Sequence, residues 1–397
     1  MKISYLLLGW GNKGGSIVLY NFMDNLVRRG HEVHAVFPDK NIKWEVGIWR
    51  YKLGTESENN NFLNFFKKNL FNIIPNSILE YYKSIIDKRN LNGLIDNWQT
   101  SDITVATFYL TAYAAYYLSD RTVPLYHMQH FEELFVSDKK NRLIARNTYY
   151  LPLIKIANSS WLKKIMKEKF NKEAYLVKPG IDLKIFKPYE NPQNKYVYKN
   201  EWRILSYLDE KREWKGFNDA VKAVKIAREY LQEKGIKLRW EVFGIDPPSK
   251  KYETDFKYIG AIFNKDLAYL YSKTDIVLLT SWYESFPLPP IEAMACGSLI
   301  ITTSFGTEDY VIDYQNGLVT MPRKILDIAN KIIYAIENPN ESLKMVKNGL
   351  KTAEEYDWES CTDVLEKVLT QSIENYSFDQ FKFFDLLSEG KLNQLET

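Results

Sequence analysis

The first forty residues alternate between short apolar runs and one helical apolar stripe. Residues 2–8 are apolar and closed by glycine, which predicts a buried strand. A glycine-rich stretch follows, and apolar positions then recur at helical spacing up to Gly30, the expected helix end: Leu19, Phe22, Met23, Leu26 and Val27. Residues 32–37 form a second apolar run. This strand–helix–strand order predicts a parallel sheet.

The same alternation continues in two series along the chain. In the first series, a helix is predicted at about 160–170, and strands at 102–108, 124–128, 153–157 and 174–177. Residues 186–201 contain two prolines and polar residues without a period, so we expect a linker there. In the second series, a long helix from about 217 to Gly235 is predicted, with strands at 202–208, 238–243, 275–280, 298–303 and 317–320. Helices continue to about residue 376.

Two consecutive series predict an α/β protein with two Rossmann-like domains and a cleft between them. We expect an N-terminal domain over 1–188, a C-terminal domain over 200–370, and a tail over 371–397 that packs back on the first domain. Ligands of such sheets bind at the carboxyl ends of the strands. The loops after residues 8, 128, 208, 243, 280 and 303 are therefore expected around the cleft.

Composition narrows the class of protein. Apolar residues make up 45% of the 397 residues, enough for sizeable cores, and the net charge of +3 argues against a nucleic-acid-binding protein. The two cysteines form neither a disulfide framework nor a zinc-ligand pattern. The apolar start is too short for a signal peptide, and no apolar run is long enough to span a membrane. We therefore expect a cytoplasmic protein.

The segment Ser281–Gly297 carries the strongest chemical signal. An apolar strand ends at Thr280, a loop carries Glu284, and a helix is expected from about Pro289, with Glu292 in its first or second turn. A helix N-terminus offers N–H groups to a phosphate. Two carboxylates on either side suit a ligand with a diphosphate in the middle and hydroxyl groups at both ends.

This segment resembles the family 4 glycosyltransferases, retaining enzymes of the GT-B fold. Their hallmark, two glutamates separated by seven residues, appears here as ESFPLPPIEAMACG. The resemblance implies that Glu284 contacts the donor sugar and Glu292 the ribose, and it places Phe286 and Leu288 among the nucleotide-sugar-binding residues. Pro287 replaces a usual glycine and removes one backbone N–H group.

Other pieces match the family in the right order, so the resemblance covers nearly the whole chain. They are Gly14-Gly15 with RGHEV at 29–33, ANSS at 157–160, KPGID at 178–182, Lys215-Gly216 and YDWES at 356–360. The resemblance implies that Gly14 and Gly15 line the nucleotide-sugar site and that Gly244 lies near the base. Gly306 and Thr307 would present N–H groups to phosphate, although Thr307 replaces a family glycine; a tight turn without a ligand is the alternative.

Lys215 is the predicted clamp for the diphosphate. The G-R that precedes it in the family is absent, so we expect Arg212 as its partner and Lys211 as a weaker candidate; a solvated charged loop is the alternative. The family also places a histidine near the reacting carbon, and His130 is that residue by our interpretation. A metal site from His127, His130 and Glu132 lacks ligand spacing elsewhere. No Asp-x-Asp occurs, and we expect neither a metal nor a cofactor.

The sequence thus predicts a retaining, metal-independent glycosyltransferase. It would move a sugar from a UDP- or GDP-linked donor to a glycan, glycolipid or protein-linked acceptor, in cell-surface polysaccharide or glycoconjugate synthesis. A nucleotide-sugar epimerase and a non-catalytic partner subunit remain alternatives. Residues 62–92 are basic and aromatic, which suits either a membrane surface or core helices of the first domain. With the former, the protein would be peripheral on the cytoplasmic membrane face.

Overall fold

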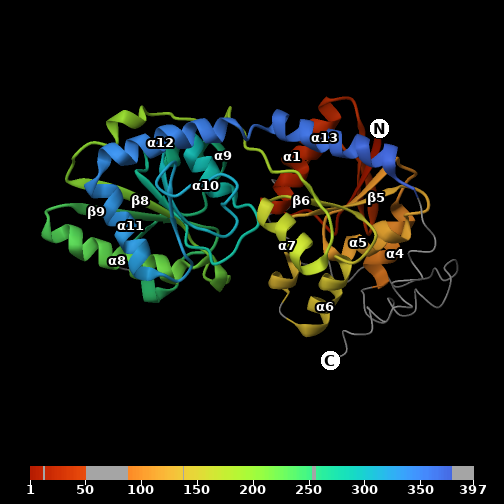
Figure 1. The fold of residues 1–397 in the computed structure, drawn as a ribbon, viewed down its shortest axis with the longest axis horizontal. Helices are drawn as coiled ribbons and strands as arrows, with labels where there is room; N and C mark the ends of the chain where they lie inside the picture. The colour runs from red at the N-terminus through yellow and green to blue at the C-terminus, as the bar shows by residue number, and fades with distance from the viewer. Residues whose placement is uncertain (12–13, 51–87, 137, 253–255, 378–397) are drawn as a thin grey trace. The chain divides into compact units, whose positions relative to one another are not determined.

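The computed structural model describes residues 1–11, 14–50, 88–136, 138–252 and 256–377. The chain divides into two compact units, which we describe separately (Figure 1). Unit 1 contains Met1–Asn158, Leu162–Val177 and the chain from Thr362 onward; unit 2 contains Ser159–Trp161 and Lys178–Cys361. Most of the segment 62–92, for which we left a membrane surface and core helices open, lies outside the described residues.

Unit 1 is built on a sheet in the order β3-β2-β1-β4-β5-β6-β7, in which β3 alone runs antiparallel to its neighbour among the described strands. The strands are β1 (Lys2–Leu6), β2 (Glu32–Phe37), β3 (Lys40–Lys43), β4 (Ile103–Ala106), β5 (Val123–Met128), β6 (Ile154–Ala157) and β7 (Tyr175–Leu176). The helices are α1 (Gly14–Arg28), α4 (Lys88–Asn97), α5 (Tyr109–Tyr117), α6 (Lys139–Thr148) and α7 (Ser160–Phe170), with the 3₁₀ turn η1 (Glu132–Phe135).

Unit 2 is built on a parallel sheet in the order β10-β9-β8-β11-β12-β13. The strands are β8 (Glu201–Tyr207), β9 (Lys237–Phe243), β10 (Lys257–Tyr258), β11 (Ile276–Leu278), β12 (Leu299–Thr303) and β13 (Leu318–Thr320). The helices are α8 (Phe217–Glu233), α9 (Asn264–Lys273), α10 (Leu288–Ala295), α11 (Ile325–Glu337), α12 (Pro339–Glu354) and α13 (Trp358–Asn375), with 3₁₀ turns η2 (Pro192–Asn194), η3 (Glu213–Lys215) and η4 (Lys250–Tyr252). The last helix, α13, begins in unit 2 and enters unit 1 at Thr362.

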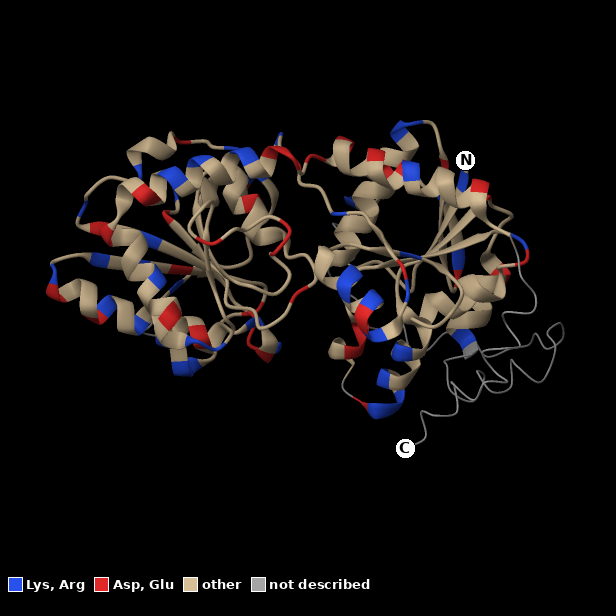
Figure 2. Ribbon diagram, in the orientation of Figure 1, with Lys and Arg blue, Asp and Glu red and all other residues tan. Residues whose placement is uncertain are grey.

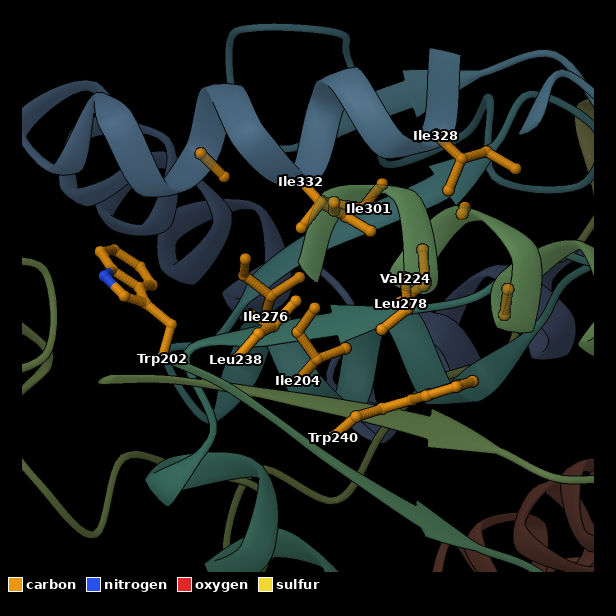
Figure 3. Close-up of a cluster of buried hydrophobic side chains, with 14 of the residues drawn as sticks. Trp202, Ile204, Val224, Leu238, Trp240, Ile276, Leu278, Ile301, Ile328 and Ile332 are labelled. Carbon is orange, nitrogen blue, oxygen red and sulfur yellow. The ribbon is translucent and has the colours of Figure 1, made fainter. Parts of the chain in front are cut away.

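The core of unit 2 follows from the alternation of side chains along its strands. Ile204, Leu278 and Ile301 point to one face of the sheet and pack with α8 and α11, as Figure 3 shows. Their neighbours Leu205, Val277 and Ile300 belong to a second cluster, with residues of α9 and α10 on the other face (Figure 1). The strands are apolar on both faces because helices cover both.

The predicted fold class, an α/β protein with two Rossmann-like sheets, is confirmed. The expected strands are found within a few residues of their predicted ends, and Gly30 follows α1 with a φ of +86°, a conformation that favours glycine. Two short strands were not predicted. They are β3, whose sequence KNIK is mostly polar, and β10, which has only two residues.

Residues 186–201 are not the free linker that we expected, because they pack on unit 2. Tyr196 is 1% exposed, and its hydroxyl donates to the carbonyl oxygen of Asp275 at 2.6 Å. Lys195 donates to the carbonyl oxygen of Thr274 at 2.8 Å. The rings of Phe186 and Tyr196 explain the difference, since they bury apolar area that a solvated linker would expose.

Candidate functional site

Three neighbouring strands of unit 2 end beside one another and carry the predicted site residues. The sheet order β8-β11-β12 places their carboxyl ends side by side. Lys215 lies on the loop after β8, Glu284 on the loop after β11, and Gly306 on the loop after β12. Parallel sheets of this kind bind ligands at this edge.

Lys215 and Glu284 form the central contact of this edge. The ammonium group of Lys215 donates a hydrogen bond to Oε1 of Glu284. Their side chains are 20% and 8% exposed, so the ion pair lies mostly out of water. The two residues are 69 positions apart in the sequence. The neighbouring strands β8 and β11 bring them together.

Two glycines allow the backbone around this pair to pack closely. A Cβ on Gly216, where φ is +67°, would lie 1.9 Å from the carbonyl oxygen of Thr280. A Cβ on Gly306, where φ is +92°, would lie 2.5 Å from the carbonyl oxygen of Glu284. A side chain at either position is excluded by both the φ angle and the contact. The glycines therefore fix where the Lys215 and Glu284 loops lie.

Arg212 and Lys211 differ in how firmly they are held. Arg212 Nε donates to Oδ2 of Asp209 at 2.5 Å, and the guanidinium is 33% exposed. Burial lowers its pKa, but the hydrogen bond and charge of Asp209 outweigh this and raise the pKa of Arg212, with a smaller contribution from Glu284. Lys211 is 77% exposed and pairs with Asp246 at 2.8 Å. Arg212 is thus the better-positioned cation beside Glu284.

The start of α10 offers fewer N–H groups than the sequence suggested. Pro287 is the residue before the helix, and Pro289 and Pro290 lie in its first turn, so none of these three carries an amide hydrogen. Leu288 keeps its N–H group. The usual helix N-terminus presents several such donors, so this one offers a phosphate fewer of them.

An aromatic cluster supports the loop between Glu284 and α10. Phe286 is buried, and its ring centroid lies 5.0 Å from that of Tyr310 and 5.8 Å from that of Tyr356. The hydroxyl of Tyr310 donates to the carbonyl oxygen of Pro287 at 2.6 Å. Phe286 therefore anchors the loop by packing against Tyr310 and Tyr356. Leu288 is half-buried and more exposed than Phe286.

Glu292 lies on α10 as a half-buried residue whose carboxyl is surrounded by protein. Burial raises the pKa of Glu292 to about 8. The pKa of Tyr271 is raised mainly by burial and further by the nearby charge of Glu292. Near neutral pH the carboxyl of Glu292 therefore carries a proton. A protonated carboxyl both donates and accepts hydrogen bonds, which suits a hydroxyl-rich ligand.

Gly244 and Thr307 are engaged within the protein. The amide of Gly244 donates to the carbonyl oxygen of Gly260 at 3.1 Å, and its own carbonyl oxygen accepts from Tyr258 at 2.8 Å. The hydroxyl of buried Thr307 donates to the carbonyl oxygen of Thr303 at 2.7 Å. Both residues shape the carboxyl edge of the sheet rather than offering all their polar groups to a ligand.

In unit 1, Gly15 and His130 lie against each other. A Cβ on Gly15 would be 3.7 Å from Nε2 of His130, and Gly14 begins α1 directly before it. The ring of His130 lies 4.8 Å from that of Phe135, and the residue keeps partial exposure. Gly14, Gly15 and His130 thus lie near one another in unit 1. In unit 2, Arg212, Lys215, Glu284 and Gly306 lie near one another, whereas Lys211, Gly244 and Glu292 have other partners or surroundings.

His127 and Glu132 have internal positions. His127 is fully buried beside Phe22, and burial lowers its pKa to about 3, so its ring is neutral. Glu132 is 3% exposed and accepts from the amide of Tyr109 at 2.6 Å, at the start of α5. Burial raises the pKa of Glu132 to about 8. Within the described residues, no group of three His, Cys, Asp or Glu side chains is arranged to hold a metal ion.

Sequence reasoning missed two features of the unit 2 site. Asp209 accepts two hydrogen bonds from Arg212. A carboxylate three residues before an arginine is a spacing from which this contact could have been predicted. Trp214 and Tyr283 stack at 6.2 Å with their planes 10° apart, beside Lys215 and Glu284 respectively. No sequence signal predicts this stacking, because it depends on which strands are neighbours.

Residues 190–352 match the model of the family described as glycosyl transferases group 1. The unit 2 site residues lie inside this range, whereas Gly14, Gly15 and His130 lie outside it. No helix among the described stretches has the length and apolar character to cross a membrane.

Two curated relatives carry related names. O-antigen chain mannosyltransferase B of Escherichia coli is 30% identical over 120 residues, which are 30% of this chain and 29% of that protein. N,N'-diacetylbacillosaminyl-diphospho-undecaprenol alpha-1,3-N-acetylgalactosaminyltransferase of Campylobacter jejuni is 25% identical over 243 residues, 56% of this chain and 60% of that protein. This chain thus spans less than two thirds of the length of either relative.

Two solved structures share the fold over nearly the whole chain. Sucrose-phosphate synthase of Thermosynechococcus elongatus has a TM-score of 0.71 at 16% identity, with 95% of this chain and 100% of that chain covered. HepE of Anabaena, in complex with UDP-glucose, has a TM-score of 0.68 at 16% identity, with 94% and 100% covered. The chain therefore has the GT-B fold, and its residues 190–352 match the model described as glycosyl transferases group 1.

Proposed function

We propose that this protein is a retaining glycosyltransferase that moves a sugar from a UDP- or GDP-linked donor to a glycan, glycolipid or protein-linked acceptor. The observation that carries the proposal is the hydrogen-bonded pair of Lys215 and Glu284 at the ends of two neighbouring strands, inside the family-matched segment. A cation and a carboxylate at this edge suit a ligand that joins a diphosphate to a sugar.

The leaving diphosphate is the group that needs most stabilisation during transfer. Lys215 and Arg212 supply positive charge to it, and the amide of Leu288 at the start of α10 adds a donor. The diphosphate competes with Glu284 for Lys215, which frees the carboxylate for a hydroxyl of the donor sugar. In this proposal the acceptor attacks from the face that the leaving group departs, so the anomeric configuration is kept.

The two side-chain cations also underlie our proposal that transfer needs no metal ion. The positive charges of Lys215 and Arg212 stabilise the negative charge of the leaving diphosphate, a role that a divalent cation has in metal-dependent enzymes. We expect full activity in excess EDTA, with at most a twofold change. A loss of activity that Mg²⁺ or Mn²⁺ restores would overturn this part of the proposal.

The remaining predicted contacts complete the donor site. Glu292 binds the ribose, and its protonated carboxyl can donate to one hydroxyl and accept from another. Gly244 lies at the end of β9, where the base is expected. Gly306, Thr307 and Lys211 border the diphosphate. His130, Gly14 and Gly15 of unit 1 are also among the proposed sugar-binding residues.

A lipid-linked acceptor and a role in cell-surface glycoconjugate synthesis are also part of the proposal. The name of the Campylobacter jejuni relative includes a diphospho-undecaprenol acceptor. In unit 1, α6 and α7 carry exposed basic residues, visible along both helices in Figure 2: Lys139, Lys140, Arg142, Arg146, Lys163, Lys164, Lys167 and Lys169. Anionic lipid attracts such residues by about 1 kcal/mol each. We propose peripheral association with the cytoplasmic membrane face.

Vesicle co-sedimentation tests the membrane part. Reversing charge with Lys163→Glu and Lys164→Glu should lower binding to vesicles of anionic lipid at least tenfold. The matched control is Lys222→Glu with Lys225→Glu on α8 of unit 2, which should leave binding unchanged. Equal binding by all three proteins would contradict a membrane surface on α7.

A transfer assay tests the function itself. UDP- and GDP-linked sugars are incubated with the purified protein and a panel of glycan and polyprenyl-diphosphate-sugar acceptors, and the anomeric configuration of the product is read by NMR. We expect one donor to yield a product of retained configuration. Inversion would refute the retaining mechanism, and an epimerised sugar nucleotide formed without acceptor would favour an epimerase. Absence of both binding and transfer would favour a non-catalytic subunit.

A further inference from the structure

Gln129, the first residue after β5, has a buried carboxamide without a partner. The residue is 5% exposed, and neither its Oε1 nor its Nε2 has a hydrogen-bond partner within the described residues. Burying an amide in this state costs about 1–3 kcal/mol. Such groups are few in native proteins, so this one requires an explanation.

The side chain of Gln129 lies against the start of α1. His127 is two residues earlier on the same face of β5, and its ring packs on Phe22 of α1 at 5.5 Å. A Cβ on Gly15 would lie 3.4 Å from Cβ and 3.7 Å from Cγ of Gln129, and 3.7 Å from Nε2 of His130. Gln129, Gly15 and His130 therefore meet at one point, where the first turn of α1 faces the end of β5.

The backbone of Gln129 is fixed while its side chain is unsatisfied. Its carbonyl oxygen accepts a hydrogen bond from Nδ2 of Asn158 at 2.9 Å. Three residues later in the same loop, the carboxyl group of Glu132 accepts a hydrogen bond from the amide of Tyr109 at the start of α5. These two hydrogen bonds fix the backbone of the loop, so the carboxamide of Gln129 has a defined position.

The chemistry of the carboxamide selects its ligand. It offers two donor hydrogens and one acceptor oxygen, and a hydroxyl group can satisfy both kinds at once. A phosphate only accepts, so it would leave Oε1 unpaired. Gly15 has no side chain, so only the backbone of α1 stands beside Cβ and Cγ of Gln129 at this point.

We propose that the carboxamide of Gln129 binds a hydroxyl group of a sugar substrate at the start of α1, next to His130. The inference rests on the proposed sugar-transfer function and adds a specificity residue to it. The sugar is that of the donor or that of the acceptor, since both offer the same hydroxyl chemistry.

Gln129→Met tests the proposal, since methionine keeps the length of the side chain and removes both polar atoms. We expect kcat/KM for sugar transfer to fall by 10- to 100-fold, while the melting temperature stays equal or rises. Binding of free UDP or GDP should change less than twofold, because these ligands contain ribose but lack the transferred sugar. The rise in KM, measured separately for donor and acceptor, identifies which sugar is bound.

Tyr5→Phe is the matched control. The hydroxyl of Tyr5 is also buried without a partner in the same sheet, on β1. Its removal should raise or preserve the melting temperature in the same way and leave kcat/KM unchanged. A similar loss of activity in both variants would show that removing a buried polar group from this sheet is enough, and would overturn the proposal.

Gly15→Ala provides a second variant that is expected to fold. Alanine is the better helix former in α1, and its Cβ would make ordinary contacts with Gln129 and His130. The added methyl group lies between the start of α1 and the side chains of Gln129 and His130, where we propose that the hydroxyl binds, so kcat/KM should fall at least tenfold without loss of stability.

The outcomes separate this inference from the proposed function. A wild-type protein that neither binds nor transfers any sugar nucleotide refutes the proposed function. A wild-type protein that transfers sugar, with Gln129→Met matching it in both KM values and in kcat, refutes the role of Gln129 alone. A Gln129→Met protein that loses stability and UDP binding along with activity would assign the residue a structural role and also overturn the inference.

Discussion

Lys215, which ends the 3₁₀ turn after β8, donates a hydrogen bond to Glu284 on the loop after β11. The contact joins two loops across neighbouring strands, and Gly306 supports the Glu284 side of it from the loop after β12. The site is therefore held together before any ligand binds. In the proposed function, the diphosphate takes over Lys215 from Glu284.

The first prediction concerns this ion pair. Lys215→Met should lower kcat/KM more than tenfold and, because it leaves the buried Glu284 unpaired, should destabilise the protein by about 3 kcal/mol. Lys215→Met combined with Glu284→Gln should recover much of the stability but none of the activity. Urea unfolding followed by circular dichroism, together with the transfer assay, on the wild type, Lys215→Met, Glu284→Gln and the double variant checks this.

A matched control for the ion pair is available in the same unit. Lys234 pairs with Glu337 at the surface, where the two side chains are 47% and 32% exposed. Exposed pairs contribute at most about 1 kcal/mol, so Lys234→Met should change neither activity nor stability appreciably. Strictly additive effects of the Lys215 and Glu284 substitutions would contradict the coupling.

The second prediction concerns Asp209, which we infer positions Arg212. Asp209→Asn should lower kcat/KM by less than Arg212→Ala does, because the arginine is still present but less firmly held. The double variant should match Arg212→Ala alone, since both changes act through one guanidinium. Steady-state kinetics of the three variants measures this, and an additive loss would show that Asp209 acts independently.

The third prediction compares two glycines with similar φ angles. Gly306 has a φ of +92° and faces the Glu284 backbone, whereas Gly235 has a φ of +73° and open space around it. Gly235→Ala should cost about 1 kcal/mol from backbone strain alone and leave activity intact. Gly306→Ala should cost more and also lower kcat at least tenfold, because the loop of Glu284 must move.

Thermal unfolding and kinetics on these two glycine variants are both needed. If Gly306→Ala loses no more stability than Gly235→Ala and keeps its activity, then the close packing against Glu284 does not position the catalytic loop. That outcome would weaken the assignment of Glu284 as well.

The fourth prediction concerns the pH dependence of stability. Burial raises the pKa of Glu132 from 4.5 to about 8. Between these values the folded protein keeps a proton that the unfolded chain releases, so the contribution of Glu132 to stability falls as pH rises from about 4.5 to about 8. Glu132→Gln cannot release a proton. The variant should match the wild type near pH 5 and become more stable than it above pH 8.

Denaturant unfolding of both proteins from pH 5 to pH 9 measures this difference. The comparison cancels the contributions of other buried groups, such as Glu292, that titrate in the same range. A constant difference in the free energy of unfolding across this range would contradict a raised pKa for Glu132.

The sequence allowed the layers of the fold to be predicted because most of its buried strands are short apolar runs. It failed where the signal is weak or depends on partners far away in the chain. The polar strand β3 has no apolar pattern, and residues 186–201 look like a linker until Tyr196 is seen packed on unit 2.

The site was predictable in its residue types but not in its contacts. The motifs suggested Lys215 and Glu284, and the missing G-R suggested Arg212, but the pairing of Lys215 with Glu284 depends on β8 and β11 being neighbours. The hold of Asp209 on Arg212 and the unpartnered amide of Gln129 likewise follow from packing. Three prolines around the start of α10 were visible in the sequence, yet their effect on the N–H groups requires the helix boundary.

Calorimetric titration of UDP and GDP into the wild-type protein, Lys215→Met and Lys234→Met tests the central claim most directly. The account predicts that one of the two diphosphates binds the wild type and Lys234→Met equally and binds Lys215→Met at least tenfold more weakly. Failure of both nucleotides to bind the wild type, or undiminished binding by Lys215→Met, would contradict the assignment of the Lys215–Glu284 pair as the diphosphate end of a nucleotide-sugar site.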